Sequence, residues 1–134
     1  MRAVLDANVI LSGLLSRAGA PAQLLERWRL GEFELVISPR LVEELERAFA
    51  YPKVRRRLDA DAASQLVEAL RELAEEAPDP EIQPSVRSRD PADDYLIALA
   101  AGAHATLVSG DAHLLELASQ IPVMSPRAFL DSLV

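Results

Sequence analysis

The chain has 134 residues, of which 50% are hydrophobic and only 4% aromatic, and it carries a formal net charge of -7 without any cysteine. This length fits one domain with a single core, and the lack of cysteine excludes disulfides, thiol catalysis and thiolate metal sites. No apolar run approaches the ~20 residues that span a membrane, and the amino terminus carries no signal-peptide pattern, so we expect a cytosolic protein. The negative charge argues against non-specific binding to a polyanion.

The first half of the chain predicts short strands that alternate with helices. Residues 2–5 form a predicted buried strand that ends at Asp6. A helix is expected from Pro21 to about Leu30, where Gly31 can close it, and a second strand from 33 to 37. If these strands are parallel, the residues that directly follow them are expected to lie at the same edge of one sheet.

A helix is expected after Ser38, which can cap it, and Pro39, which suits its first turn. On this helix Glu43 and Arg47 lie four apart on the polar face and can pair. Glu44 instead lies on the border of the apolar stripe. A border carboxylate is commonly a surface residue, so Glu44 alone indicates little.

The middle of the chain predicts a short basic helix from Tyr51-Pro52 to Leu58, and a longer helix that starts at Asp59 or Asp61. That helix ends by Ala77-Pro78, and a polar loop with several prolines leads to Arg89. The loop is not expected to separate two domains, because too few residues flank it to form two cores.

Three carboxylates stand at the start of the next helix, which is otherwise apolar. Asp90 can cap it and Pro91 suits its first position, so the cap accounts for one acid only. Asp93 and Asp94 add negative charge to a helix whose sequence predicts burial. A third strand is expected over 105–108, and further elements are expected as a strand over 122–124 and helices from His113 and from Ser125 to Leu133.

This alternation predicts a three-layer α/β/α sandwich around a parallel sheet of about four to five strands. In such sheets the functional crevice lies outside the carboxyl ends of the strands, where Asp6 and Asp111 follow their strands. The helices that carry Glu44 and Asp93 start from the same edge. Four carboxylates in one crevice need a compensating charge, and their oxygens suit one or two Mg²⁺ or Mn²⁺ ions that activate water for phosphodiester hydrolysis.

Several short motifs occur in order along the chain: Leu5-Asp6-Ala7-Asn8-Val9, Ser38-Pro39 with Glu44-Leu45, Tyr51-Pro52-Lys53, Asp90-Pro91-Ala92-Asp93, and Val108-Ser109-Gly110-Asp111 with Leu114-Leu115. Together they resemble a known family, the PIN domain nucleases that include VapC-type toxins. They are most similar to the subgroup described as the toxin component of the PIN family.

The resemblance implies that the four acids of the family fall on Asp6, Glu44, one of Asp93 and Asp94, and Asp111. The register of the helix start favours Asp93, with Asp94 as a close second. It also implies two supporting residues: Asn8 matches a polar residue that supports the first acid, and Ser109 matches a hydroxyl residue before the last.

The resemblance further implies a single nuclease domain over residues 1–134 that cleaves RNA, a small antitoxin that occludes the crevice, and a homodimer. Few basic residues offer contacts to RNA phosphates. The candidates are Lys53, Arg55, Arg56 and Arg57.

Two other classes of protein fail at named residues, and a third remains as the alternative. A phosphoryl-accepting receiver domain needs an acidic pair after the first strand and a late lysine, but Asp6 is followed by Ala7, and Lys53 lies in mid-chain. A haloacid-dehalogenase-type phosphatase needs a second aspartate where Asn8 stands. A non-catalytic or housekeeping subunit of the PIN fold, which would bind nucleic acid or protein, is the strongest alternative. His104 and His113 are expected to be structural or surface residues.

Overall fold

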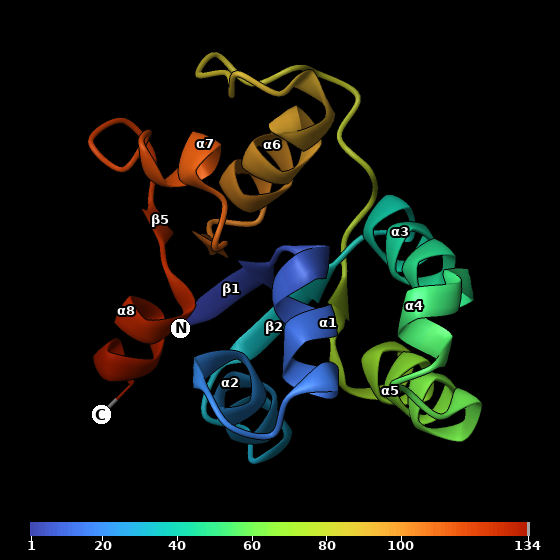
Figure 1. Ribbon diagram of the computed structural model, residues 1–134. Helices are drawn as coiled ribbons and strands as arrows, with labels where there is room; N and C mark the ends of the chain where they lie inside the picture. Colours follow the sequence, from blue (N-terminus) through green and yellow to red (C-terminus); the bar gives the residue numbers. More distant parts are fainter. Residues whose placement is uncertain (134) are drawn as a thin grey trace.

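The computed structural model describes residues 1–133 and has a sheet of five parallel strands at its centre (Figure 1). The strands are β1 (Arg2–Leu5), β2 (Glu34–Ile37), β3 (Glu75–Glu76), β4 (Thr106–Val108) and β5 (Val123–Met124), in the spatial order β3-β2-β1-β4-β5. In the central strand, Ala3 pairs with Leu35 of β2 and with Thr106 of β4. Because all pairs are parallel, the carboxyl ends of the strands share one edge of the sheet.

The strands expected near residues 2–5, 33–37, 105–108 and 122–124 are confirmed. They form because their side chains are buried from both sides; Ala3, Val4 and Leu5, for example, are fully buried. The sequence did not predict β3, which consists of two exposed glutamates. Its pairing with Val36 and Ile37 of β2 makes it a strand, and no apolar pattern marks it in advance.

Helices cover both faces of the sheet, which confirms the expected three-layer α/β/α sandwich. One face carries α1 (Ala7–Leu15), α2 (Ala20–Arg29) and α8 (Pro126–Ser132), and the other carries α6 (Asp94–Gly102) and α7 (Ala112–Leu115) (Figure 1). A 3₁₀ turn, η1 (Pro91–Asp93), leads into α6. Among residues 1–133, no helix has the length and apolar character needed to cross a membrane.

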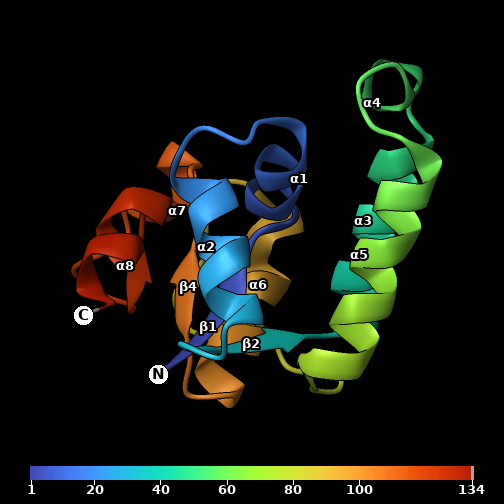
Figure 2. The ribbon, with the colours of Figure 1, turned by 90° about the horizontal axis from the view of Figure 1, so that it is seen from below.

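The remaining helices form a hairpin beside the β2–β3 edge. It consists of α3 (Pro39–Ala50), α4 (Pro52–Arg55) and α5 (Ala60–Leu73). Figure 2 shows α3 and α5 next to each other, with α4 joining them at the end that points away from the sheet. The expected pair between Glu43 and Arg47 is confirmed, with 3.5 Å between the charged atoms. The Asp59 side chain caps α5, which settles the choice between Asp59 and Asp61.

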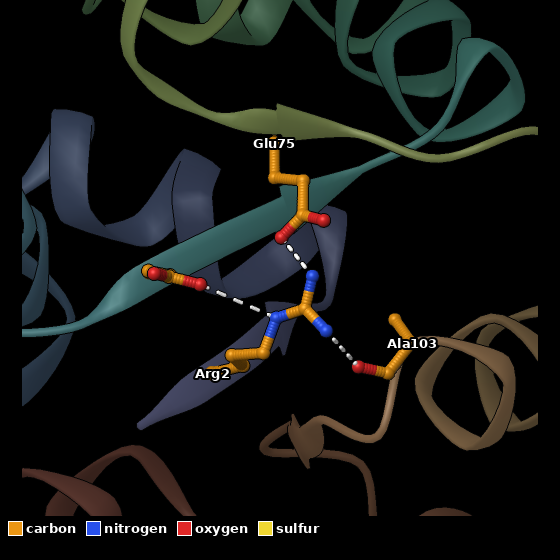
Figure 3. A network of polar contacts seen from close by, with 4 residues as sticks. Arg2, Glu75 and Ala103 are labelled. Carbon is orange, nitrogen blue, oxygen red and sulfur yellow. Dashed lines mark hydrogen bonds and ion pairs between the residues drawn. The ribbon is translucent and has the colours of Figure 1, made fainter.

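At the amino end of β1, one arginine holds several elements together (Figure 3). The Arg2 guanidinium donates to the carbonyl oxygen of Ala103, just after α6, at 2.6 Å, and it pairs with Glu75 of β3. Its Nε lies 3.3 Å from the carboxylate of Glu34 on β2. These contacts join three strands and one helix at the edge opposite the acidic residues, and so they support the sheet without taking part in the candidate site.

Candidate functional site

Asp6 follows β1 directly and is buried, with 7% of its surface exposed. It caps α1, because its Oδ1 accepts a hydrogen bond from the backbone amide of Asn8 at 3.4 Å. Its own backbone amide donates to the carbonyl of Val108, so β1 and β4 stay paired up to the site. Burial raises the pKa of Asp6, and the nearby Asp111 adds to this, while hydrogen bonds from Ser109 and the Asn8 amide oppose it.

Ser109 connects two of the acids from the end of β4. Its hydroxyl donates to Oδ2 of Asp6 at 2.9 Å and accepts from the backbone amide of Asp111 at 3.0 Å. Ser109 is fully buried, so both hydrogen bonds are shielded from water. Asp111 in turn caps α7 by accepting from the backbone amide of His113 at 2.9 Å. The structure therefore places Asp6, Ser109 and Asp111 in one connected group.

Asn8 contacts Asp6 through its backbone amide, and its side chain is exposed. An amide of any residue except proline can make this contact, so the capping hydrogen bond does not explain why an asparagine stands here. The Asn8 side chain instead helps to line a hollow of about 390 Å³ beside the acids. This hollow is lined by Asp6, Asn8, Val9, Ser12, Pro21, Gly110, Asp111 and Pro126.

Asp93 reaches the same group from the start of α6. Burial raises the pKa of Asp93 to about 7, and the carboxylates of Asp6, Asp90 and Asp111 add to this shift. A hydrogen bond between Asp93 and Asp111 is available only while one of the two carries a proton. Asp93 Oδ2 is buried and has no hydrogen-bond partner among the described residues. A buried carboxylate oxygen without a hydrogen-bond donor costs free energy, and a bound cation would offset this cost.

Asp94 and Asp90 serve the local backbone. Oδ1 of Asp94 accepts from the backbone amide of Ser88 at 2.8 Å, and only 8% of the residue is exposed. The Asp90 side chain accepts from the amide of Ala92 at 3.0 Å, which confirms the predicted cap. Asp94 is therefore held by the loop before α6, and it is not among the charges that raise the pKa of Asp6 or Asp93.

Glu44 of α3 is linked to the group only through an aromatic neighbour, and its carboxylate is not among the charges that raise the pKa of Asp6 or Asp93. Tyr95 of α6 is 7% exposed, and burial first and then the Glu44 carboxylate raise its pKa, with a further contribution from Asp6. The Tyr95 hydroxyl has no partner of standard hydrogen-bond geometry among residues 1–133. On its other side, the guanidinium carbon of Arg40 lies 4.1 Å from the centroid of the Tyr95 ring.

The carboxylates are a suitable donor set for a metal ion, but they are not arranged as a finished site. Within residues 1–133, no group of three or more acidic, histidine or cysteine side chains could hold a metal ion as it stands. Their chemistry still fits a hard divalent cation, because all candidate ligands are carboxylate oxygens and Asp93 Oδ2 has no hydrogen-bond partner within residues 1–133. Small side-chain movements would have to complete such a site.

The basic residues expected to bind RNA lie away from the acids. Lys53, Arg55, Arg56 and Arg57 are exposed, on or just after α4. Arg57 donates to the carbonyl of Leu15 at 3.4 Å, at the opposite end of α1 from Asp6. The length of α1 separates these ends by roughly 12 Å at 1.5 Å per residue. A larger groove of about 590 Å³ lies between α3, α4 and α5, and none of Asp6, Asp93 and Asp111 lines it.

Two residues of this region were not predicted from the sequence, namely Arg40 and Tyr95. Arg40 lies four residues before Glu44 on one helix, and Tyr95 lies two residues after Asp93 on another. These spacings could have drawn attention to both residues. Their contact could not be predicted, because it depends on how α3 and α6 are placed.

The sequence matches the PIN domain family over residues 2–118. A comparison with curated proteins gives no match. Among solved structures, the chain is similar to the PilT N-terminus domain protein SSO1118 from Sulfolobus solfataricus, at 17% identity and a TM-score of 0.62, covering 100% of this chain and 94% of that one.

Two further structures show the same fold. PAE2754 from Pyrobaculum aerophilum is 18% identical, with a TM-score of 0.67 and coverage of 99% of this chain and 89% of that one. FitAcB from Neisseria gonorrhoeae is 20% identical, with a TM-score of 0.60 and coverage of 93% and 98%. PIN domains are generally nucleases that use divalent metal ions. Since the family match spans most of the sequence, this chain belongs to the PIN domain family.

Proposed function

We propose that this protein is an endoribonuclease that hydrolyses RNA phosphodiester bonds with Mg²⁺ or Mn²⁺, and that it is the toxin of a toxin–antitoxin pair. The observation that carries the proposal is the convergence of Asp6, Asp93 and Asp111 at one edge of the sheet, with Asp93 Oδ2 buried and unpartnered. Repulsion between these carboxylates destabilises the folded protein, so the stability of the fold does not explain why they lie together.

In this proposal Asp6, Glu44, Asp93 and Asp111 hold the metal. One or two divalent ions bound there would lower the pKa of a water molecule and stabilise the leaving oxygen. Ser109 and the Asn8 amide fix the Asp6 carboxylate in place. Asp94 is the weaker candidate for a ligand, because its Oδ1 already accepts from the Ser88 amide.

The proposal of a toxin rests on the sequence resemblance to VapC-type proteins, and the solved structures support it only at the level of fold. An antitoxin and a homodimer belong to the same proposal. The proposed contacts to RNA phosphates come from Lys53, Arg55, Arg56 and Arg57. Arg57 contacts the end of α1 opposite to Asp6, so these residues would bind phosphates that flank the cut and not the phosphate that is cleaved.

The test is cleavage of end-labelled RNA with Mg²⁺, Mn²⁺ or EDTA. We expect cleavage with either ion and none with the chelator. Asp6→Asn and Asp111→Asn should each lower the rate by more than about 10²-fold, because metal stabilisation of the transition state is worth several kcal/mol. Asp131→Asn is the matched control, because Asp131 is exposed and paired with Arg127 on α8.

The outcomes separate the alternatives. Cleavage that continues in EDTA would contradict the metal mechanism. A protein that binds RNA but cleaves it with neither ion would instead be a non-catalytic binding subunit. Induced expression in bacteria tests toxicity: growth should stop with the parent protein and continue with Asp6→Asn, and growth unaffected by an active parent would indicate a housekeeping nuclease.

A further inference from the structure

The guanidinium of Arg40 lies over the ring of Tyr95, with 4.1 Å between its central carbon and the ring centroid. Arg40 lies in the first turn of α3, and Tyr95 lies in the first turn of α6. Glu44 lies on α3, and α6 begins directly after Asp93. A cation over an aromatic face is attracted to it, so the ring restrains the guanidinium. The charges of Glu44 and Asp6 also act on Tyr95, so Arg40 shares a neighbour with these two acids.

The Arg40 guanidinium has no carboxylate partner among residues 1–133. Among residues 1–133, six of the twelve other arginines form ion pairs: Arg2, Arg27, Arg47, Arg71, Arg89 and Arg127. Arg40 differs from the other unpaired arginines in its contact with Tyr95. The backbone amide of Arg40, not its guanidinium, donates a hydrogen bond to Oδ1 of Asp79 at 3.0 Å. Glu44 lies four residues further along the same helix, and the two charges still do not pair. Arg40 therefore carries a positive charge that forms no ion pair with the described residues and that lies over the Tyr95 ring.

Stability of α3 does not explain this position. The positive end of the helix dipole lies at the amino terminus, so an arginine in the first turn is disfavoured there. An exposed cation–π contact contributes only about 0.5–1 kcal/mol. The ring beneath it is unusual in another way, because Tyr95 is 7% exposed and its hydroxyl lacks a partner among the described residues. The Arg40–Tyr95 contact therefore contributes little to the stability of the fold.

We propose that Arg40 binds a phosphate of the RNA substrate next to the acidic site, and that Tyr95 positions its guanidinium for this contact. The inference rests on the proposed RNA cleavage. A planar guanidinium binds a phosphate through two parallel hydrogen bonds, which a lysine cannot do. Such a charge also offsets the repulsion that an RNA backbone meets from Asp6, Glu44, Asp93 and Asp111. The basic residues near α4 are too remote to provide this.

The first experiment compares Arg40→Gln and Arg40→Lys with Arg47→Gln, a control on the exposed face of the same helix. For Arg40→Gln we expect KM for a short single-stranded RNA to rise about tenfold while kcat changes less than about threefold. The slope of log binding constant against log salt should become shallower by about 0.7, the value for one phosphate contact to a single strand. Arg40→Lys should keep the salt slope and raise KM by a smaller factor. Arg47→Gln should match the parent in both quantities.

A second set of variants tests the role of the ring. Tyr95→Phe keeps the stacking surface and should retain a low KM, whereas Tyr95→Leu should raise KM towards the Arg40→Gln value. Since Tyr95 acts through Arg40, adding Tyr95→Leu to Arg40→Gln should raise KM no further. Thermal unfolding shows which variants are folded. Mn²⁺ affinity should not fall in Arg40→Gln, because Arg40 is not a ligand and its removal takes a positive charge away from the acids.

The inference is overturned if the parent cleaves RNA and Arg40→Gln has the same KM and salt slope. Failure of the parent to cleave RNA would overturn the proposed function instead. In that case, anisotropy of fluorescent RNA in EDTA still measures binding to the parent and to Arg40→Gln. Equal affinities there would also remove Arg40 from the interface.

Discussion

The ionisation of Asp93 links the candidate site to the stability of the protein. Burial raises the pKa of Asp93 to about 7, with Asp6, Asp90 and Asp111 adding to the shift. An unfolded aspartate titrates near pH ~3.9, so the folded protein holds this proton more tightly than the unfolded chain. Stability from Asp93 is therefore fully present below about pH 4 and is lost as the pH rises towards about 7.

Replacement of Asp93 by asparagine should remove the loss of stability that accompanies ionisation of Asp93 as the pH rises. In EDTA, Asp93→Asn should have a higher Tm than the parent at pH 8, and the difference should shrink as the pH falls to 5, because the parent carboxyl is then protonated. Thermal unfolding by circular dichroism at both pH values measures this. Asp131→Asn is the control and should follow the parent. A Tm of Asp93→Asn below that of the parent at pH 8 would show that the carboxylates do not repel one another in the folded state.

Asp94 should behave differently from Asp93, because it stabilises the backbone before α6. Asp94→Ala leaves the buried Ser88 amide without its acceptor and should lower the free energy of unfolding by about 1–3 kcal/mol. Asp94→Asn retains an oxygen at this position and should cost less. Urea unfolding of both variants, together with their RNA cleavage rates, is the measurement. A larger loss of kcat in Asp94→Asn than in Asp93→Asn, with both proteins folded, would make Asp94 the metal ligand.

At the scale of elements, α1 and α2 pack closely against each other at Gly13, and this is possible because Gly13 has no side chain. A Cβ atom at Gly13 would lie 2.7 Å from Cδ1 of Leu25 and 2.9 Å from the carbonyl oxygen of Pro21. The Leu25 side chain can move, but the Pro21 backbone cannot do so without shifting α2. The position of α1 matters for the site, because Asp6 caps this helix.

Gly13→Ala should therefore destabilise the protein. Overpacking of this kind costs about 1–3 kcal/mol. Gly102→Ala is the control, since Gly102 is also helical and a Cβ there meets nothing within 4 Å. It should be neutral or stabilise by up to about 1 kcal/mol. Urea unfolding of the two variants decides the matter, and equal midpoints would mean that α1 and α2 adjust to each other without cost.

For the molecule as a whole, metal binding should be coupled to folding. A ligand that binds only the folded state stabilises it by about 2.7 kcal/mol at a free concentration of 100 Kd. For a domain of this size, 1 kcal/mol corresponds to roughly 3–5 °C in Tm. Saturating Mn²⁺ should thus raise the Tm of the parent by about 8–13 °C.

The same addition should leave the Tm of Asp6→Asn and Asp111→Asn nearly unchanged, because each variant lacks one proposed ligand. Differential scanning calorimetry with Mn²⁺ and with EDTA is suitable. Ca²⁺ serves as a comparison, because it prefers more ligands and longer distances. An equal rise in the parent and both variants would place the bound ion elsewhere on this acidic surface.

Much of the architecture could be predicted from the sequence, because it depends on local patterns. Buried strands appear as short apolar runs, and the starts of α3, η1 and α8 are marked by a capping residue followed by proline. The carboxyl-edge rule then placed Asp6 and Asp111 near each other, and the structure connects them through Ser109. The expectation that residues 1–134 form one nuclease domain stays a prediction, as do the metal ligands and the RNA contacts.

The sequence by itself determined the fold class and the acids that gather at one edge, since both follow from the order of strands, helices and caps along the chain. Only the tertiary structure decided which acid at the start of α6 stays unpartnered. The difference between Asp93 and Asp94 comes from the Ser88 amide and from the nearness of Asp111, and neither follows from spacing. The same holds for β3 and for Arg40 on Tyr95. These features depend on contacts between elements far apart in sequence, whose placement is set by the packing of the whole core.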